Sequence, residues 1–113
     1  MGGVADPIVR RFAADYLPEL RRRYDPELVL VFGSRARGDA LADSDLDLLI
    51  VSERFRTLSF TERATAVLTD LDMSFAVDVL CYTPEEFRRK REELGTVQAA
   101  IEEGLPLYRA GSS

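Results

Sequence analysis

The sequence predicts an α+β domain whose elements follow the order α-β-β-α-β-α. Short apolar runs of strand length occur at residues 28–32, 45–51 and 75–82, and runs of this kind suit strands that are covered on both faces. Amphipathic stretches with recognisable helix starts lie before, between and after these runs. We expect a single domain over residues 1–113, because this length is typical of one domain with its own core.

The N-terminal part of the chain predicts a helix that is interrupted once. Asp6-Pro7 combines a typical N-cap residue with proline at the first helical position. Pro18 should split the helix near Leu17, because proline removes a backbone donor and restricts the residue before it. Apolar residues recur at four-residue spacing along one helix face: Ile8, Phe12, Tyr16, Leu20 and Tyr24.

Two capping-box patterns start the later helices. Residues 59–62 (S-F-T-E) follow the second strand, and residues 83–86 (T-P-E-E) follow the third. Gly95 should break or bend the second of these helices, and a last short helix should precede an edge segment at 105–108. The chain ends, 1–5 and 110–113, are expected to be flexible.

The most informative stretch runs from Val29 to Val51, where the first strand leads into a glycine turn, a polar loop and the second strand. Asp45 and Asp47 open that second strand. Because residues two apart on a strand share one face, these two carboxylates project together. Magnesium removes their mutual repulsion, since it takes one or two carboxylates together with substrate phosphates. The pattern therefore favours a site for magnesium and phosphate.

Gly33 and Ser34, at the end of the first strand, add to this interpretation. Gly33 lets the backbone approach a phosphate closely, and Ser34 offers a hydroxyl and an amide donor. The stretch lacks the G-K-[ST] of a Walker A loop and the G-x-G-x-x-G of a dinucleotide site. A calcium loop is the other alternative, because Asp43 alternates with the two later acids. It fails because Leu48 stands where that loop needs glycine and Arg54 where it needs glutamate.

Asp78 is an isolated acid inside the otherwise apolar third strand. Burying an unpaired carboxylate costs several kcal/mol, roughly, or forces it to stay protonated. Asp78 is therefore expected to have a cationic partner. That partner is either an arginine in a structural salt bridge or a metal ion.

Composition narrows the function. The net charge of -5 argues against general nucleic-acid binding, which needs a basic surface. The absence of histidine excludes serine–histidine triads and histidine-bound zinc. No signal peptide and no apolar run of membrane-spanning length are present. The single cysteine, Cys81, cannot form an internal disulfide, which fits a reducing cytoplasm.

These features together resemble the minimal nucleotidyltransferases of the DNA polymerase β superfamily. The resemblance rests on G-S-R-A-R-G at 33–38, D-S-D-L-D-L at 43–48 and V-D-V at 77–79, with E-G-L-P-L-Y at 103–108 similar to the family's usual ending. It covers nearly the whole chain. It implies a polymerase β-like nucleotidyltransferase fold, with a mixed sheet of three to four strands, helices on one face and an open site on the other.

The resemblance also implies nucleotidyl transfer from a nucleoside triphosphate, with ATP as substrate. Asp45 and Asp47 would ligate two Mg2+ ions. Asp78 would ligate the second ion and help to deprotonate the acceptor hydroxyl. Two metal ions clamp the attacking and leaving oxygens of an in-line displacement, so this chemistry needs no histidine.

Four further residues receive binding roles from the resemblance. Gly33 and Ser34 would cradle the β- and γ-phosphates. Arg37, with Arg35 as the weaker candidate, would neutralise triphosphate charge; the alternative for either arginine is a side chain that faces water.

The resemblance extends to a partner. Stand-alone members of this family commonly pair with a small helical HEPN toxin, to which the nucleotidyltransferase is the antitoxin. This chain would then transfer AMP to a tyrosine of that toxin. An enzyme acting on a small molecule or a nucleic-acid end, and a non-catalytic subunit that neutralises its partner by binding, remain alternatives. The sequence leaves open the base preference, the number of nucleotides transferred and the formation of a homo- or hetero-oligomer.

Overall fold

The computed structural model describes residues 5–111, which form an α+β domain around a four-stranded mixed sheet. The strand order is β3-β2-β1-β4. β1 (Leu28–Phe32) runs antiparallel to both β2 (Leu46–Val51) and β4 (Leu105–Arg109), whereas β3 (Val77–Tyr82) runs parallel to β2. The predicted class, the mixed sheet and the edge segment near the C-terminal end are confirmed.

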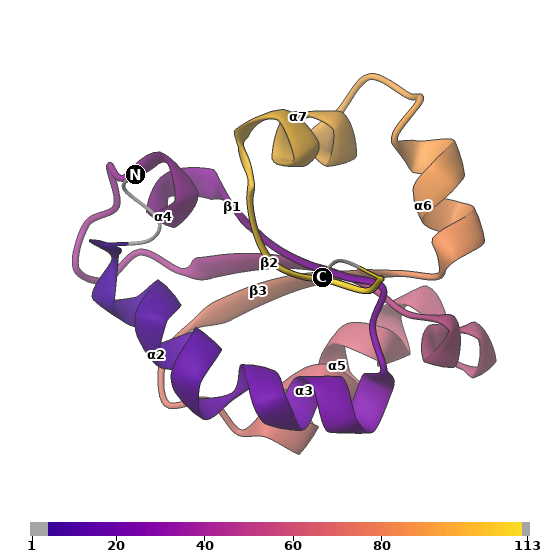
Figure 1. The fold of residues 1–113 in the computed structure, drawn as a ribbon, viewed down its shortest axis with the longest axis horizontal. Helices are drawn as coiled ribbons and strands as arrows, with labels where there is room; N and C mark the ends of the chain where they lie inside the picture. The colour runs from indigo at the N-terminus through magenta and orange to yellow at the C-terminus, as the bar shows by residue number, and fades with distance from the viewer. Residues whose placement is uncertain (1–4, 112–113) are drawn as a thin grey trace.

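Three helices cover the lower face of the sheet in Figure 1. They are α2 (Pro7–Asp15), α3 (Leu17–Tyr24) and α5 (Phe60–Leu71). The central strands send every second side chain into this layer, as the period of two requires. The largest buried side chains of this core are Phe12, Leu20, Val29, Val31, Leu46, Leu48, Ile50, Phe55 and Val67.

The upper face carries helices as well, which corrects the expectation of helices on one face. α6 (Pro84–Lys90) and α7 (Thr96–Glu103) lie above the sheet (Figure 1). β1 and β2 are apolar on both sides, so their upper side chains also need cover. A second core results, made of Leu28, Leu30, Leu49, Val51, Tyr82, Val97 and Ala100.

The predicted helix boundaries are largely confirmed. The Asp6 side chain accepts hydrogen bonds from the amides of Ile8 and Val9, at 2.9 and 3.1 Å. The first helix is split at Tyr16, as Pro18 predicted. Both capping boxes are present, and Gly95 precedes α7.

The glycine turn and polar loop expected after the first strand begin with a short α-helix, α4 (Gly33–Arg37). A 3-10 helix, η1 (Glu53–Thr57), follows the second strand. β2 begins at Leu46, so Asp45 lies just before the strand and does not open it. The expected flexibility of the chain ends falls mostly on positions outside the described residues.

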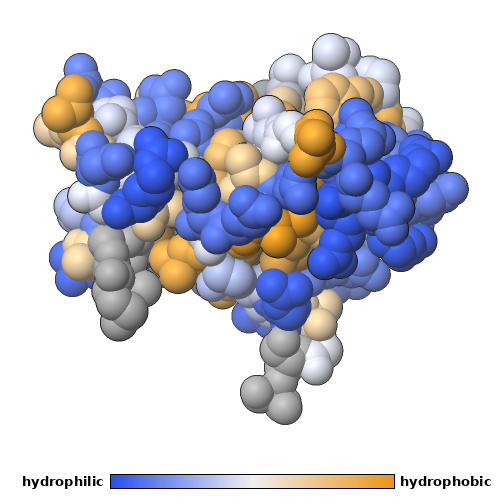
Figure 2. Space-filling view, turned by 90° about the horizontal axis from the view of Figure 1, so that it is seen from above, coloured by the Kyte–Doolittle hydropathy of each residue, from blue (hydrophilic) through white to orange (hydrophobic). Residues whose placement is uncertain are grey.

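The surface of the upper face is mixed in character. Figure 2 views this face and shows hydrophilic side chains gathered on the side of α6, next to smaller hydrophobic areas. Among residues 5–111, no helix combines the length and the apolar character needed to cross a membrane.

Candidate functional site

Two of the predicted acids, Asp47 and Asp78, lie side by side at one end of the upper face. Asp47 on β2 is the register partner of Asp78 on β3, and partners on adjacent strands project to the same side of a sheet. Asp45 directly precedes Leu46, whose amide donates to the Ala76 carbonyl at 2.9 Å, so the two strand entrances stay side by side. Asp78 and Asp47 therefore lie on the same side of the sheet.

The turn into α4 brings Gly33 against this acid group. Phe32, the last residue of β1, is the register partner of Asp47 on the other side of β2. Gly33 follows with a φ of +72°, in the left-handed region that favours glycine. A Cβ at this position would overlap the Asp47 carboxylate and lie 3.2 Å from its Cγ. Glycine thus leaves the room that the Asp47 carboxylate occupies against the start of α4.

The three carboxylates lack a paired cationic side chain among residues 5–111. Within the part of the chain that the structure describes, no hydrogen bond or ion pair joins Asp45, Asp47 or Asp78 to another side chain. The pKa of Asp47 is raised, first by partial burial and then by the negative charges of Asp78 and Asp45, while Arg37 lowers it. A structural salt bridge to Asp78, the alternative left open by the sequence, is absent from the described residues. The expectation that Asp78 is buried and therefore needs a cationic partner is wrong, because its side chain is exposed at the start of β3, where water solvates it.

These carboxylates suit a metal ion that is also bound by phosphate oxygens. No group of three carboxylates among residues 5–111 converges as a ready-made metal cage. Magnesium does not need one, because it typically takes one or two carboxylates and completes its shell with phosphate oxygens and water. Asp47 and Asp78, on adjacent strands, match that requirement, and the raised pKa of Asp47 means that burial and the neighbouring negative charges disfavour its ionised form.

Arg35 does not face this site, which corrects its expected role in binding triphosphate. Its side chain is 5% exposed and pairs with both oxygens of Asp6, at 3.1 and 2.9 Å. Its other nitrogens donate to the backbone carbonyls of Ala42 and Ser44. All its nitrogens are engaged, so Arg35 fastens the loop before Asp45 to α4 and α2.

Arg37 lies at the exposed end of α4. Its guanidinium pairs with Asp39 and Glu103, both at 3.3 Å, and is almost half exposed. Exposed ion pairs contribute little, about 0–1 kcal/mol, and rearrange readily. Arg37 is therefore free to turn toward an anion beside Asp47, whose pKa it already lowers.

Asp6 was missed by the sequence analysis as part of the support for the site. Its N-cap role was visible locally, but its contact with Arg35 joins residues 29 positions apart. No local pattern signals such a contact.

Comparison with known proteins decides the family. The family model named Nucleotidyltransferase domain matches residues 14–91, more than half of the chain. The chain belongs to the nucleotidyltransferase domain family. The matched residues include Gly33, Asp47 and Asp78 and run from the end of α2 beyond α6.

One curated relative is a protein from Haemophilus influenzae named as the protein adenylyltransferase MntA. It is 39% identical over 62 residues, which span 53% of this chain and 54% of that protein. This nucleotidyltransferase chain thus matches about half the length of that relative.

Solved structures agree on the fold. A candidate nucleotidyltransferase from Sulfolobus solfataricus superposes with a TM-score of 0.64 at 22% identity, over 97% of this chain and 89% of that chain. A toxin–antitoxin structure with AMP-PNP gives a TM-score of 0.53 at 24% identity, over 84% of this chain and 72% of that chain.

Proposed function

We propose that this protein is a magnesium-dependent nucleotidyltransferase that transfers AMP from ATP to a hydroxyl group, and that the acceptor is a tyrosine of a HEPN-type toxin. The observation that carries the proposal is the placement of Asp47 beside Asp78 and against Gly33, with no protein cation between the acids among the described residues. Family membership supports the reaction class.

Each residue of the site has a proposed role. Asp45 and Asp47 hold two Mg2+ ions together with the triphosphate, and Asp78 holds the second ion. Bound there, the ions would supply charge stabilisation for the attacking and leaving oxygens. Asp78 also accepts hydrogen bonding from the acceptor hydroxyl and orients it.

The phosphate end of the substrate lies on the other side of Asp47. Gly33 and Ser34 receive the β- and γ-phosphates, because the missing Cβ and the hydroxyl allow close polar contact. Arg37 neutralises part of the triphosphate charge, in place of its exposed pairs with Asp39 and Glu103. Arg35 keeps the loop before Asp45 in position and touches no substrate.

The acceptor is proposed from the relatives. The relative named MntA is described as a protein adenylyltransferase, which favours AMP transfer to a protein. A structurally similar chain comes from a toxin–antitoxin structure that contains AMP-PNP. A toxin partner and a cytoplasmic location, where Cys81 stays reduced, complete the proposal.

The test is incubation with α-labelled ATP, Mg2+ and the helical protein encoded by the neighbouring gene. We expect label on the partner from the wild type and a loss of about a hundredfold or more in Asp45→Asn with Asp47→Asn. Asp43→Asn is the matched control, because Asp43 is exposed in the preceding loop, outside the strand register. Neutralisation of the partner that survives the double change would instead support a non-catalytic binding subunit.

A further inference from the structure

A cavity opens between α6 and the strand ends that lie farthest from α4. Its volume is about 400 Å³, at the lower end of the range of binding pockets. Leu28 of β1, Val51 of β2 and Arg109 of β4 line it side by side, because Leu28 is the register partner of both other residues. Leu28 and Val51 are buried, and with the buried Pro84 of α6 they form an apolar floor.

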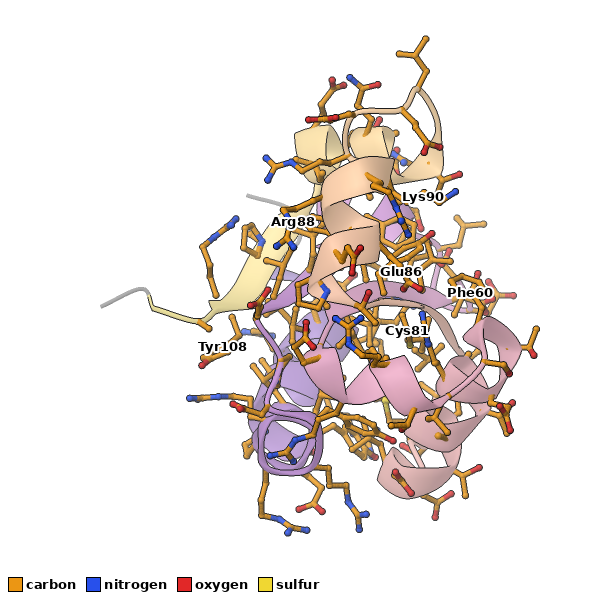
Figure 3. The ribbon with its side chains drawn as sticks, turned by 90° about the vertical axis from the view of Figure 1, so that its right-hand side faces the viewer. Phe60, Cys81, Glu86, Arg88, Lys90 and Tyr108 are labelled. Atoms are coloured by element: carbon orange, nitrogen blue, oxygen red, sulfur yellow. The ribbon has the colours of Figure 1, made fainter. Side chains whose placement is uncertain are left out.

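Three arginines surround this floor. Arg88 and Arg91, three residues apart at the end of α6, are neighbours on one side of the helix, and Arg109 ends β4. Figure 3 shows Arg88 and Lys90 on opposite sides of α6, with Arg88 on the side of β4. The Arg91 guanidinium lies 5.7 Å from the centroid of the Phe87 ring, which also lines the cavity. Among residues 5–111, no ion pair or hydrogen bond engages the three guanidinium groups.

The positive charge of the cavity is not cancelled by its surroundings. Glu27 is the one acid among the described residues that line it. The C-terminal end of α6 adds roughly half a negative charge. Glu53 lies near Arg88, but its pKa is lowered mainly by its hydrogen bonds with Arg56, 2.8 Å away. The three arginines therefore leave the cavity cationic in a chain of net charge -5.

The acids Asp45, Asp47 and Asp78 are too far away to compensate this charge. Leu28 pairs with Val51 at one end of β1 and β2, whereas Asp47 takes part in the pair at the other end. Four residues of strand separate the two pairs, which corresponds to about 13 Å. This distance exceeds the Debye length of about 8 Å at physiological ionic strength. The exposed charges of the two ends are therefore largely screened from each other.

We propose that this cavity is a docking site for a short acidic segment of the partner protein, remote from the acids that bind the nucleotide. The inference rests on the partner named in the proposed function, but not on AMP transfer. Guanidinium groups bind carboxylates through paired N–H donors, and an apolar residue next to those carboxylates covers the floor. Arginine and aromatic side chains around an apolar centre are also the residues that dominate the binding energy of protein interfaces.

The charges around the cavity favour a short acidic segment over an extended nucleic acid. Glu27 lies among the lining residues, and Glu53 and Glu85 lie close together beside α6, where both pair with Arg56. A nucleic acid that continued beyond the cavity would bring its phosphates toward these carboxylates, which repel it. A few acidic side chains meet the arginines and end before that point.

A contact at this distance holds the partner without taking part in the reaction. When two contacts belong to one complex, forming the first makes the second intramolecular, which raises the overall affinity. Loss of the docking contact should therefore raise the KM for the partner and leave the kcat at saturating partner unchanged.

The test reverses the charge of the cavity. Arg88→Glu with Arg109→Glu changes two exposed side chains of the cavity. Arg10→Glu with Arg89→Glu is the matched control, because these arginines are exposed outside the cavity and the net charge changes equally. Isothermal titration with the helical protein encoded by the neighbouring gene should give a Kd weakened by about tenfold or more in the cavity variant. The control should stay close to the wild type.

A milder variant guards against a folding defect. Arg88→Gln with Arg109→Gln removes the same charges without adding acids, and it should weaken the Kd for the partner in the same direction. The affinity for AMP-PNP with Mg2+ should stay unchanged in both cavity variants. Equal Kd values for the partner in the cavity variants and the control would overturn the inference. A loss of AMP-PNP affinity in the cavity variants would also overturn it, because the cavity would then belong to the nucleotide site.

The same samples separate this inference from the proposed function. A wild type that transfers no label from α-labelled ATP, but still binds the partner more tightly than the cavity variants do, would refute AMP transfer and retain the docking site. Transfer of label with no difference in Kd or KM between the cavity variants and the control would retain the enzyme and refute the docking site.

A titration followed by NMR tests the chemistry of the occupant. The amide signals of Leu28, Val51 and Arg109 should shift when the full chain is titrated with a short peptide of alternating glutamate and leucine. A short oligothymidylate should shift them less. Larger shifts with the oligothymidylate, or none with the peptide, would overturn the assignment of the cavity to an acidic protein segment.

Discussion

The two ends of the upper face treat their carboxylates in opposite ways. At the α6 end, Glu86 meets the buried guanidinium of Arg63 and the amide of Thr83, and these hydrogen bonds lower its pKa. At the α4 end, Asp47 faces Asp78 and Asp45, and burial and like charges raise its pKa. The protein pairs the Glu86 carboxylate with a cation and donors. The Asp47 carboxylate is instead destabilised in its ionised form by burial and by like charges.

This difference separates a structural site from a functional one. Glu86 needs nothing further, because the protein supplies both its cation and its donors. Asp47 makes no hydrogen bond or ion pair with another side chain among the described residues, and its raised pKa marks it as a candidate for binding a ligand that supplies positive charge. The predictions below test whether the two ends differ in this way.

The largest effect on stability is expected at the α6 end. Arg63 donates to the carbonyls of Phe55, Leu58 and Cys81 as well as to Glu86. Arg63→Met removes these donors and leaves a partly buried carboxylate unpaired, which should lower the free energy of unfolding by about 3 kcal/mol. Urea unfolding measures this loss.

Arg89→Met serves as the control for that change. Arg89 is exposed on α6, so its replacement should alter the unfolding free energy by no more than about 0.5 kcal/mol. Equal losses in the two variants would mean that the hydrogen bonds of Arg63 contribute no more to stability than an exposed surface residue does.

A smaller stability effect and a larger activity effect are expected at the α4 end. Gly33→Ala combines a φ of +72° with an overlap between the new Cβ and Asp47. We expect a loss of about 1 kcal/mol in unfolding free energy, from the left-handed backbone, and a much stronger fall in AMP transfer. Gly111→Ala is a suitable control, since its φ is also positive but nothing lies near its Cβ. If AMP transfer in Gly33→Ala falls no more than its loss of stability explains, the proposed close contact between Gly33 and the phosphates is contradicted.

The smallest effects are the pH dependences, and they should have opposite signs. Because the folded-state pKa of Asp47 is raised, its carboxylate destabilises the fold above that pKa. Asp47→Asn should therefore be more stable than the wild type at pH 7, and this advantage should vanish as the pH falls through the raised pKa to about 4.

Glu86→Gln is the mirror case. The lowered pKa of Glu86 means that its carboxylate stabilises the fold above the ordinary glutamate pKa. The variant should be less stable than the wild type at pH 7, and the deficit should disappear as the pH falls through the lowered pKa. Thermal unfolding across the acid range distinguishes the two curves, and curves of the same sign would remove the contrast between the two ends.

Much of the site followed from the sequence because strand geometry is simple. The period of two placed Asp47 on the opposite side from Leu46 and Leu48, and the apolar runs identified both neighbouring strands. The pairing of Asp47 with Asp78 needed only the register of β2 and β3. Helix boundaries were equally accessible, because the caps at Ser59 and Thr83 depend on residues three positions apart.

The errors came from features that no local pattern encodes. Residues 33–37 form a helix, and each helical residue turns by about 100°. Arg35 therefore points inward to Asp6, although it stands next to Ser34. The position of α6 and α7 on the upper face was missed for a similar reason. The sequence of an amphipathic helix shows that one of its faces is apolar, but not which side of the sheet that face packs against.

Thermal unfolding with AMP-PNP and Mg2+ tests the central claim most directly, because it needs no acceptor. If the acids form one site for cation and triphosphate, ligand at about 100 times its Kd should raise the Tm by roughly 5 °C or more. That rise should be absent from Asp45→Asn with Asp47→Asn and retained in Asp43→Asn. A wild type with no rise, or a rise that persists in the double variant, would contradict the account.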